Sequence, residues 1–336
     1  MKLLIVVVNY NATDLTIDCL DSLVDEMASM PWAHVGLCDN GSTEEESDRL
    51  ERTVKQRGWQ DWISFTHLDP NLGFCGGNNA VIRPAIASDS QPEYVMLLNN
   101  DTIVRPGAIQ ILVDFMDAHP DAGIAGSRLE DPDGTPQVSA FGFSGVASEF
   151  DRGLKTGLVS RLLRRWLVRQ PVPNVTCRTD WIPGASMIIR KQVIADVGVL
   201  DEGFYTYFDD IDYCLNAARR GWPTWYVPTS RIVHLVGATT GMAKVEAQAP
   251  RPERVPSYWF QARRRFYLKN HGPFRAMRVD FAFLAGIIPG RVKRLLIGQG
   301  YLDPPHLIGD FLSHSVFCRG FQVKDVSNPA LVETGS

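Results

Sequence analysis

The sequence predicts an α/β fold with a mostly parallel central sheet, helices on both faces and a helical extension at the carboxyl-terminal end. Two observations predict the sheet: apolar runs rich in Val and Ile alternate with helical patterns, and polar clusters follow the ends of those runs. A third predicts the extension, because the composition becomes rich in Arg and aromatic residues after Pro250. An apolar fraction of 45% in 336 residues supports a large core and excludes a disordered chain.

The first half of the chain alternates between the two kinds of element. We expect strands at Leu3–Val8, Val35–Cys38, Ile63–Leu68, Tyr94–Leu98 and Gly123–Gly126. We expect helices at 13–27, Thr43–Arg57, Gly77–Ala87 and Pro106–Ala118. Leu3–Val8 is continuously apolar, as is typical of a strand buried on both faces. The repeated strand–helix order favours a parallel sheet.

The second half is less regular. We expect a turn at Asp131–Gly134, a basic amphipathic stretch at 153–170, a strand at Trp181–Ile189, and helices at about 210–220 and at Tyr258–Lys269. Residues 1–245 would form the main domain, with halves 1–126 and 127–245 and a basic insertion at 151–170. Residues 246–336 would form the helical extension, with a tail from about residue 323.

Cysteine usage and the start of the chain bear on its compartment. The six cysteines show no C-x-x-C pair and no metal-ligand spacing, which favours reduced, buried thiols. The sequence enters a strand pattern directly after Met1, without the pattern of a signal peptide. We therefore expect a cytoplasmic location, at the inner face of the cell membrane if the basic segments bind lipid.

Basic residues are concentrated in two segments, although the net charge is −4. Residues 151–170 and 251–300 together contain 17 Lys and Arg against 3 Asp and Glu. A basic surface beside apolar residues favours contact with anionic lipid, and the alternatives are a solvated face or arginines paired with acids. The residues that fit an interfacial helix are Trp166 with Arg161, Arg164, Arg165 and Arg169, and Trp259, Phe260 and Tyr267 with Arg263–Arg265. Phe281–Ile288 is too short to cross a bilayer but long enough to lie at its surface.

Two polar clusters follow predicted strands of the first half. Asn99-Asn-Asp-Thr102 follows Tyr94–Leu98, and Asp101 there has the chemistry to hold a divalent cation or to cap a helix. Asp39-Asn-Gly-Ser42 follows the second strand, where Asp39 is a candidate acceptor for the imide N–H of a uracil-like or thymine base, or part of an ordinary turn. The carboxyl ends of parallel strands are where open α/β sheets bind ligands.

Three further segments carry candidate chemistry. Asn71–Asn79 is rich in Gly and Asn, which suits close approach of a phosphate or an ordinary loop. The crowding of Asp209, Asp210 and Asp212 predicts a raised pKa, as a general base requires, although caps of a helix are an alternative. His234 ends a short apolar strand and is either a metal ligand or a structural histidine.

Taken together, these segments resemble a family 2 glycosyltransferase of the GT-A fold, in its bacterial rhamnosyltransferase-like branch. The resemblance covers about residues 1–240 and is carried, in the family's order, by Val7-Val-Asn-Tyr-Asn11, Asp39-Asn-Gly-Ser42, Asn71–Asn79, Leu97–Thr102, Trp181-Ile-Pro-Gly-Ala185, Phe208–Tyr213 and Val233-His-Leu-Val-Gly237. One departure is Asn99, which stands where the family has the first acid of its Asp-x-Asp motif.

The resemblance implies a role for each matching residue. Asp210 would be the catalytic base, and Asp101 and His234 would bind Mg²⁺ or Mn²⁺. The donor would contact Asn9, Asn11, Asp39, Asn71, Gly76, Asn79, Asn99 and Asn100. The donor sugar and the acceptor would contact Trp181, Pro183, Gly184 and Asp209.

The implied function is the inverting, metal-dependent transfer of a sugar to a glycan or a lipid-diphosphate acceptor in bacterial polysaccharide synthesis. The sugar that the resemblance favours is L-rhamnose, donated by dTDP-rhamnose. UDP- and GDP-sugars stay open as donors. No nucleic acid partner is expected, and the basic segments would contact a membrane or a second copy of the chain. The alternatives are a catalytically silent nucleotide-sugar-binding partner of a polysaccharide assembly complex and a pyrophosphorylase. The presence of Asp101, Asp210 and His234 favours the enzyme over the first, and Asn9–Thr13 lacks the Gly-rich, basic loop of the second.

Overall fold

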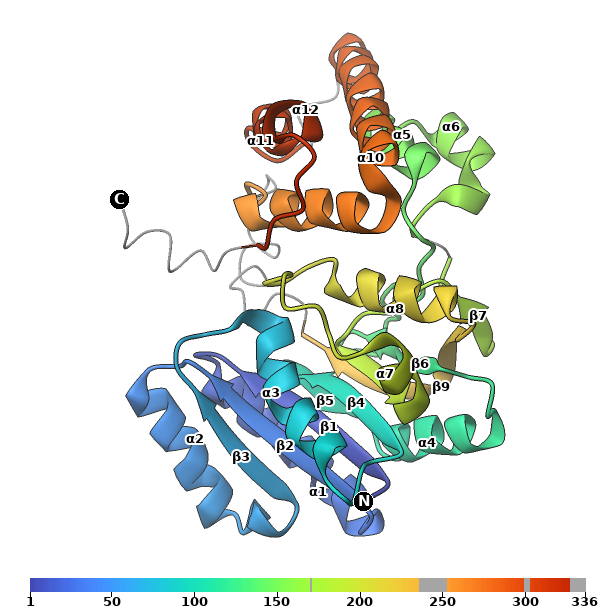
Figure 1. Ribbon diagram of the computed structural model, residues 1–336. Coiled ribbons are helices and arrows are strands. Elements are labelled where there is room, and N and C mark those ends of the chain that lie inside the picture. Colours follow the sequence, from blue (N-terminus) through green and yellow to red (C-terminus); the bar gives the residue numbers. More distant parts are fainter. Residues whose placement is uncertain (170, 236–252, 299–302, 327–336) are drawn as a thin grey trace. The chain divides into compact units, whose positions relative to one another are not determined.

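The computed structural model describes residues 1–169, 171–235, 253–298 and 303–326 (Figure 1). Its chain forms two compact units. The first comprises Met1–Ala140, Pro171–Glu202 and Asp209–Val245, and the second Phe141–Gln170, Gly203–Phe208 and Glu246–Ser336. The basic stretch at 151–170 therefore groups with the carboxyl-terminal part of the chain, whereas the sequence pattern placed it as an insertion in the main domain.

A nine-stranded sheet forms the centre of the first unit within the described residues. Its order is β3-β2-β1-β4-β8-β6-β9-β5, with β7 paired to β9. The strands are β1 (Leu3–Asn9), β2 (Ala33–Asn40), β3 (Ile63–Leu68), β4 (Tyr94–Asn99), β5 (Thr102–Val104), β6 (Ile124–Glu130), β7 (Cys177–Thr179), β8 (Ser186–Arg190) and β9 (Thr224–His234). The β3-β2-β1-β4 half is parallel, as predicted, and β8 begins a mixed half by pairing antiparallel with both β4 and β6.

Helices cover both faces of this sheet, as the sequence predicts. They are α1 (Thr13–Ser29), α2 (Glu44–Gln56), α3 (Gly73–Ala87), α4 (Ala108–Ala118), α7 (Lys191–Val197) and α8 (Asp209–Arg219), with a short 3₁₀ turn η1 (Trp59–Asp61). Ile5 of β1 shares a core cluster with Leu20 of α1 and Leu112 of α4. On the other face α3 lies against the strands (Figure 1). Gly36 of β2 permits this approach, since a Cβ there would lie 2.2 Å from Val81 of α3.

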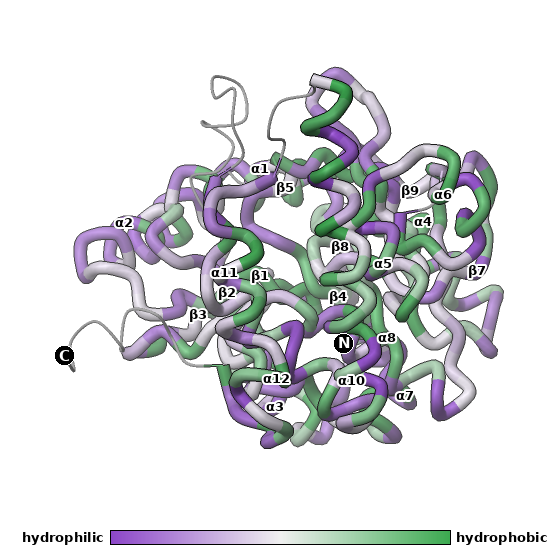
Figure 2. The backbone as a smooth tube through the Cα atoms, turned by 90° about the horizontal axis from the view of Figure 1, so that it is seen from above, coloured by the Kyte–Doolittle hydropathy of each residue, from purple (hydrophilic) through white to green (hydrophobic). Residues whose placement is uncertain are grey.

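Solvent exposure follows the amphipathic pattern of the helices. In α2 the buried residues are Ser47, Leu50 and Val54, and Figure 2 shows how hydrophilic most of this helix is. Thr43 caps its amino terminus by accepting a hydrogen bond from the Glu46 backbone N–H. Four of the six cysteines are buried, Cys177 is partly exposed and Cys318 is exposed.

The second unit is helical. It contains α5 (Val146–Leu154), α6 (Gly157–Leu162), η2 (Arg164–Trp166), α10 (Ser257–Leu296), α11 (Leu307–His314) and α12 (Val316–Arg319). Helix α10 bends at Gly272, whose φ of 74° belongs to the left-handed region that glycine adopts without strain. Pro273 follows and has no backbone N–H to continue the ladder. The helix therefore consists of two arms, drawn in orange in Figure 1.

A buried ion network lies at the centre of the second unit. The Arg263 guanidinium donates to Glu149 at 2.8 Å and to Asp280 at 2.5 Å, and all three side chains are almost completely buried. Burial alone would raise the pKa of Glu149, but the charges of Arg152 and Arg263 outweigh it and hold that pKa below its usual value. Paired arginines thus account for part of the basic composition.

One sequence-based expectation about this unit was wrong. Phe260 and Tyr267 do not face a membrane, because they are 3% and 1% exposed and fill the interior of the unit. Trp259 packs edge-on against Phe260 and Phe208. The first arm of α10 is consequently an internal helix. Among the described residues, no helix is long and apolar enough to cross a membrane.

Candidate active site

The turn between β4 and β5 carries the polar cluster that follows Tyr94–Leu98. The Thr102 hydroxyl donates to the Asn99 carbonyl at 2.7 Å, and the Asn100 amide donates to the Thr16 hydroxyl at 2.9 Å, which fixes the turn against α1. Asp101 is buried here, and its Oδ1 atom has no hydrogen-bond partner within the described residues. A buried carboxylate oxygen without a partner is costly unless a ligand completes its contacts.

His234 lies directly beside that oxygen. Antiparallel pairing of β5 with β9 sets Thr102 opposite His234, and the Leu235 N–H donates to the Asp101 carbonyl at 2.9 Å. The His234 Nε2 atom lies 3.4 Å from Asp101 Oδ1, and the imidazole is mostly buried. Sheet pairing therefore brings together Asp101 and His234, the two residues that the family resemblance implies as metal ligands.

The donor set fits a divalent cation that shares its ligands with a substrate. A carboxylate oxygen is a usual ligand of Mg²⁺ and Mn²⁺, and an imidazole nitrogen is a usual ligand of divalent transition metals. Among residues 1–169, 171–235, 253–298 and 303–326, no group of three His, Cys, Asp or Glu side chains converges for a metal ion. Two protein ligands leave most coordination positions for water and phosphate oxygens, as is usual for Mg²⁺ in nucleotide sites.

A buried carboxylate that was not predicted from the sequence, that of Glu130, holds β9 and the segment after β5 next to β6. Glu130, at the end of β6, is fully buried and forms ion pairs with Arg105, Arg128 and Arg231 at 3.1, 3.0 and 2.8 Å. Burial would raise the pKa of Glu130, but hydrogen bonds from Arg231 and Arg105 outweigh it and lower that pKa. The signal in the sequence is an acid that ends an apolar strand. We call these three ion pairs the Glu130 clamp; they join the segment after β5 to β6 and β9.

The Asp39 carboxylate lies at the carboxyl end of β2 within a chain of hydrogen bonds. The Asn9 amide donates to Asp39 Oδ1 at 2.8 Å, and the Thr16 hydroxyl donates to the side-chain oxygen of Asn9, Oδ1, at 2.8 Å. Asp39 Oδ2 is buried without a hydrogen-bond partner in the described part of the chain, while His67 Nδ1 lies 3.3 Å away. Since Asn9 is fully buried, its amide orients Asp39 rather than meeting solvent. His67, at the end of β3, was not singled out from the sequence.

Asn11 joins the loops that follow β1 and β2. Its side-chain oxygen accepts the Thr43 N–H at 3.0 Å, and its backbone N–H donates to the Ser42 hydroxyl at 2.9 Å. Its φ of 48° is one of the few left-handed values outside glycine, and asparagine adopts such values more readily than most residues.

Hydrogen bonds inside the first unit occupy the amides of the Asn71–Asn79 segment. The Asn71 side-chain oxygen accepts the Gly73 N–H at 2.7 Å, at the beginning of α3. Asn79 is fully buried, where its amide donates to the Leu200 carbonyl and to Glu202, both at 2.8 Å. A Cβ at Gly76 would lie 2.4 Å from the Leu72 Cβ, so glycine is required by the packing of α3 itself.

The acidic pair begins α8. Asp209 is 7% exposed and Asp210 is half-buried. Burial raises the pKa of Asp210 to about 6, although hydrogen bonds from the Ile211 and Gly184 backbone N–H groups oppose the shift. Burial and the neighbouring charge of Asp210 raise the pKa of Asp209 further. Near neutral pH, Asp210 is thus the member of the pair that is ionised.

The segment Trp181–Ala185 connects the acidic pair to the turn between β4 and β5. Gly184 donates its backbone N–H to Asp210, and the Ala185 carbonyl accepts the Asn99 N–H at 3.1 Å. A Cβ at Gly184 would come within 3.1 Å of the Phe74 ring, which explains why this position is glycine. Trp181 and Pro183 are partly exposed in the same segment. Asp101, Asp210 and Gly184 therefore all attach to the carboxyl end of β4.

The chain is similar to known proteins in sequence and in fold. A family model described as Glycosyltransferase like family 2 matches residues 2–266. The chain is 27% identical over 219 residues to N-acetylglucosaminyl-diphospho-decaprenol L-rhamnosyltransferase of Mycobacterium tuberculosis. The aligned region covers 61% of this chain and 67% of that protein. It is 23% identical over 192 residues to rhamnosyltransferase WbbL of Escherichia coli, which covers 56% of this chain and 70% of that protein.

Solved structures with the same architecture confirm the expected fold. The structure of GalNAc-T7 with UDP, GalNAc and Mn²⁺ superposes with a TM-score of 0.58 at 14% identity, over 94% of this chain and 54% of that one. The mannosyltransferase PcManGT from Pyrobaculum calidifontis, in complex with GDP-Man and Mn²⁺, superposes with a TM-score of 0.54 at 14% identity, over 95% of this chain and 83% of that one.

Proposed function

The chain belongs to glycosyltransferase-like family 2 and has the GT-A fold, and we propose that it is an inverting, metal-dependent sugar transferase acting on a nucleotide-diphospho-sugar. The observation that carries the proposal is the buried Asp101 Oδ1 atom, which has no hydrogen-bond partner within the described residues and lies 3.4 Å from His234 Nε2. A nucleotide-diphospho-sugar is the kind of substrate that would bring phosphate oxygens to a cation held there.

Asp101 and His234 are the proposed ligands of Mg²⁺ or Mn²⁺. When bound, the cation would supply positive charge that neutralises the diphosphate leaving group. Mn²⁺ in the GalNAc-T7 and PcManGT structures supports a divalent cation. Asn99 carries no charge, so we assign it to hydrogen bonding with the donor rather than to the metal.

Asp210 is the proposed general base. Ionised above about pH 6, it would accept the proton of the acceptor hydroxyl while that oxygen forms its bond to the anomeric carbon. The bond from the anomeric carbon to the diphosphate oxygen breaks in the same displacement, so the configuration inverts. The Gly184 N–H would orient the carboxylate, and Asp209 would keep its proton because its pKa is raised further.

The donor would lie along the strand ends from β2 to β4. Asp39 Oδ2, which accepts no hydrogen bond from the part of the chain that the structure describes, suits the imide N–H of thymine or uracil, and His67 lies beside it. The names of the two bacterial relatives support L-rhamnose as the sugar that is transferred, and dTDP-rhamnose is the donor we propose. Asn71 and the Asn100 turn would line the diphosphate, while Asn9, Asn11 and Asn79 would position the loops around it.

The acceptor we propose is a glycan linked to a lipid diphosphate, used in polysaccharide synthesis at the inner face of the cell membrane. The name of the Mycobacterium tuberculosis relative, which includes a diphospho-decaprenol, supports this choice. Trp181 and Pro183 are partly exposed in the segment whose Gly184 donates its N–H to Asp210, so they are the candidate contacts of the acceptor sugar.

A binding experiment tests the metal and donor assignments together. We expect dTDP-rhamnose to raise the melting temperature in Mg²⁺ or Mn²⁺ but not in chelator, and Asp101→Asn to abolish the metal-dependent part of that rise. Asp48→Asn, which changes an exposed acid on α2, is the matched control. An unchanged metal response in Asp101→Asn would contradict the site. Metal-dependent binding without release of nucleoside diphosphate would instead favour the silent binding partner.

A further inference from the structure

The second arm of α10 exposes a row of large apolar side chains. Phe274, Phe281, Ile288 and Leu295 recur every seven residues and are 81, 67, 58 and 59% exposed. Seven residues span about two helical turns, so these side chains share one face of the arm. Exposed apolar rows of this length are uncommon on isolated proteins and mark surfaces that bind another body.

The opposite face of the same arm is packed too closely to rotate. A Cβ at Gly286 would lie 2.2 Å from the Phe150 carbonyl oxygen of α5, and one at Gly290 would lie 2.6 Å from the Leu154 carbonyl oxygen. Phe283 and Ile287 on that side belong to a core cluster with Phe311 of α11. The apolar row is therefore fixed in its outward direction.

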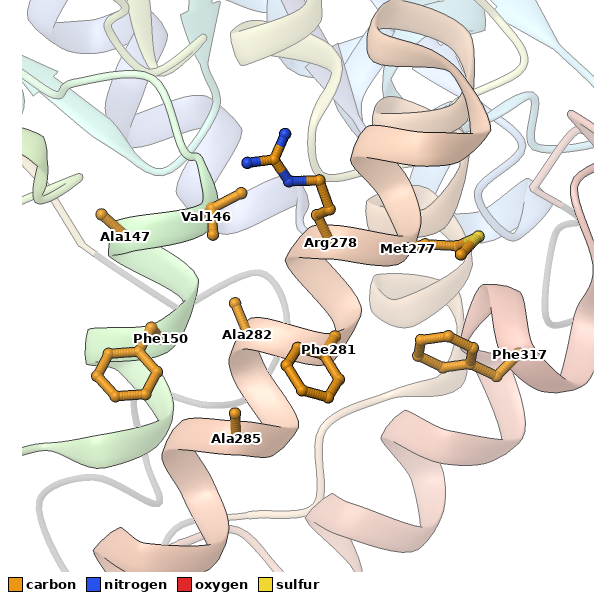
Figure 3. Close-up of a pocket in the computed structure, with 9 residues that line it drawn as sticks. All are labelled: Val146, Ala147, Phe150, Met277, Arg278, Phe281, Ala282, Ala285 and Phe317. Carbon is orange, nitrogen blue, oxygen red and sulfur yellow. The ribbon is translucent and has the colours of Figure 1, made fainter.

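A groove borders the exposed row. It has a volume of about 720 Å³ and lies between α5 and the second arm of α10. Figure 3 shows the rings of Phe150, Phe281 and Phe317 around it, with Met277 beside them and the Arg278 guanidinium at one end. A groove with this lining suits a hydrocarbon chain, and the guanidinium at its end suits an anionic headgroup.

The charges around the row distinguish between two possible partners, a second copy of the chain and a lipid surface. Arg275, Arg278 and Lys293 are exposed on the second arm, whereas its single acid, Asp280, is 2% exposed and bound to Arg263. Two copies of the chain that met through this face would bring like charges together. An anionic lipid surface is complementary to it.

Helix α6 and η2 also expose large apolar side chains beside a basic one. Leu158 and Leu162 are both 72% exposed, and Trp166 is 46% exposed with the Arg165 guanidinium 3.9 Å from its ring centroid. The Lys293 ammonium donates to the Thr156 hydroxyl at 3.5 Å, so α6 begins next to the second arm.

We propose that the second arm of α10, the groove beside it and α6 form a surface that binds an anionic lipid bilayer. We call it the lipid face. Its aromatic and aliphatic side chains would enter the boundary between headgroups and acyl chains, and its arginines and lysine would contact lipid phosphates. The chain would thus bind the membrane by insertion of side chains. This inference does not depend on the proposed sugar transfer.

Vesicle co-sedimentation with the full chain tests the lipid face. We expect binding to phosphatidylcholine–phosphatidylglycerol vesicles, and a loss of about a hundredfold in the partition constant for the triple variant Phe274→Ser, Phe281→Ser and Ile288→Ser. Val175→Ser removes a side chain that is 69% exposed in the first unit and should leave binding unchanged. All of these positions are exposed, so thermal unfolding should confirm that the variants fold.

A charge variant separates insertion from electrostatic attraction. Arg275→Gln with Arg278→Gln should weaken binding to the anionic vesicles by about thirtyfold, and should have little effect on pure phosphatidylcholine vesicles. Failure of the wild-type chain to bind anionic vesicles, or equal binding by the triple variant, would overturn the proposal. A dimer in solution that the triple variant abolishes would also overturn it, by assigning the face to a second copy. Donor binding, measured in parallel, should be the same in every variant.

Discussion

Replacement of Asp210 by asparagine should make the protein more stable at neutral pH while removing its activity. Burial raises the pKa of Asp210 from its usual 3.8 to about 6. Each pKa unit corresponds to about 1.36 kcal/mol, so ionisation of this carboxylate costs the folded state about 3 kcal/mol. Asparagine avoids that cost, and the favourable backbone hydrogen bonds to the charged form are already included in the shift. The expected gain in the free energy of unfolding is therefore about 3 kcal/mol.

The sign of the pH dependence follows from the raised pKa. Because the folded state binds the proton more tightly than the unfolded state, the protonated carboxyl stabilises the folded wild-type protein below its unfolded pKa of 3.8, and that stability is lost as the pH rises through about 6. Asparagine does not titrate, so the advantage of Asp210→Asn should be absent at about pH 4 and complete above about pH 7.

Urea unfolding of wild type and Asp210→Asn at these two pH values measures the difference. Asp48→Asn, an exposed acid, should show little change at either pH and serves as the control. Equal stabilities of wild type and Asp210→Asn above pH 7, or a less stable variant, would refute the reasoning that burial of this carboxylate opposes folding.

Further predictions concern the rest of the site. Asp39→Asn removes a charged acceptor, so we expect calorimetry to show binding of dTDP or UDP weakened about tenfold to a hundredfold, and unchanged affinity would exclude the base contact. Glu130→Gln should lower the free energy of unfolding by about 2–4 kcal/mol, because it leaves three arginines around a neutral side chain; a melting temperature equal to that of wild type would refute the clamp. The value of kcat/KM should fall about tenfold per pH unit below about pH 6, where Asp210 takes up its proton, and a flat profile down to about pH 5 would contradict its role as base.

Local patterns predicted the parallel half of the fold well. The strand expected at Ile63–Leu68 has those limits in the structure, because its apolar residues are bounded by turn residues on both sides. The three-residue strands β5 and β7 are too short to show a period, so sequence reasoning did not find them. Only the beginning of β6 was expected, since Arg128 and Glu130 interrupt its apolar pattern.

The site was predictable where a motif carries the chemistry itself. Asp101 and His234 were nominated from sequence resemblance, and their pairing is the result of the β5–β9 ladder, which no local pattern encodes. The Glu130 clamp and His67 could not be found in this way, because their meaning depends on partners far away in the chain. Spacing likewise suggested an interfacial role for the first arm of α10, whereas tertiary packing buries Phe260.

The most direct test of the central claim is the release of nucleoside diphosphate from dTDP-rhamnose in the presence of acceptor. We expect release in Mg²⁺ or Mn²⁺ and none in chelator for the wild-type enzyme. We also expect that Asp210→Asn binds the donor with near-normal affinity but releases nucleoside diphosphate about a thousandfold more slowly. Release by Asp210→Asn at close to the wild-type rate would contradict the assignment of Asp210 as the base.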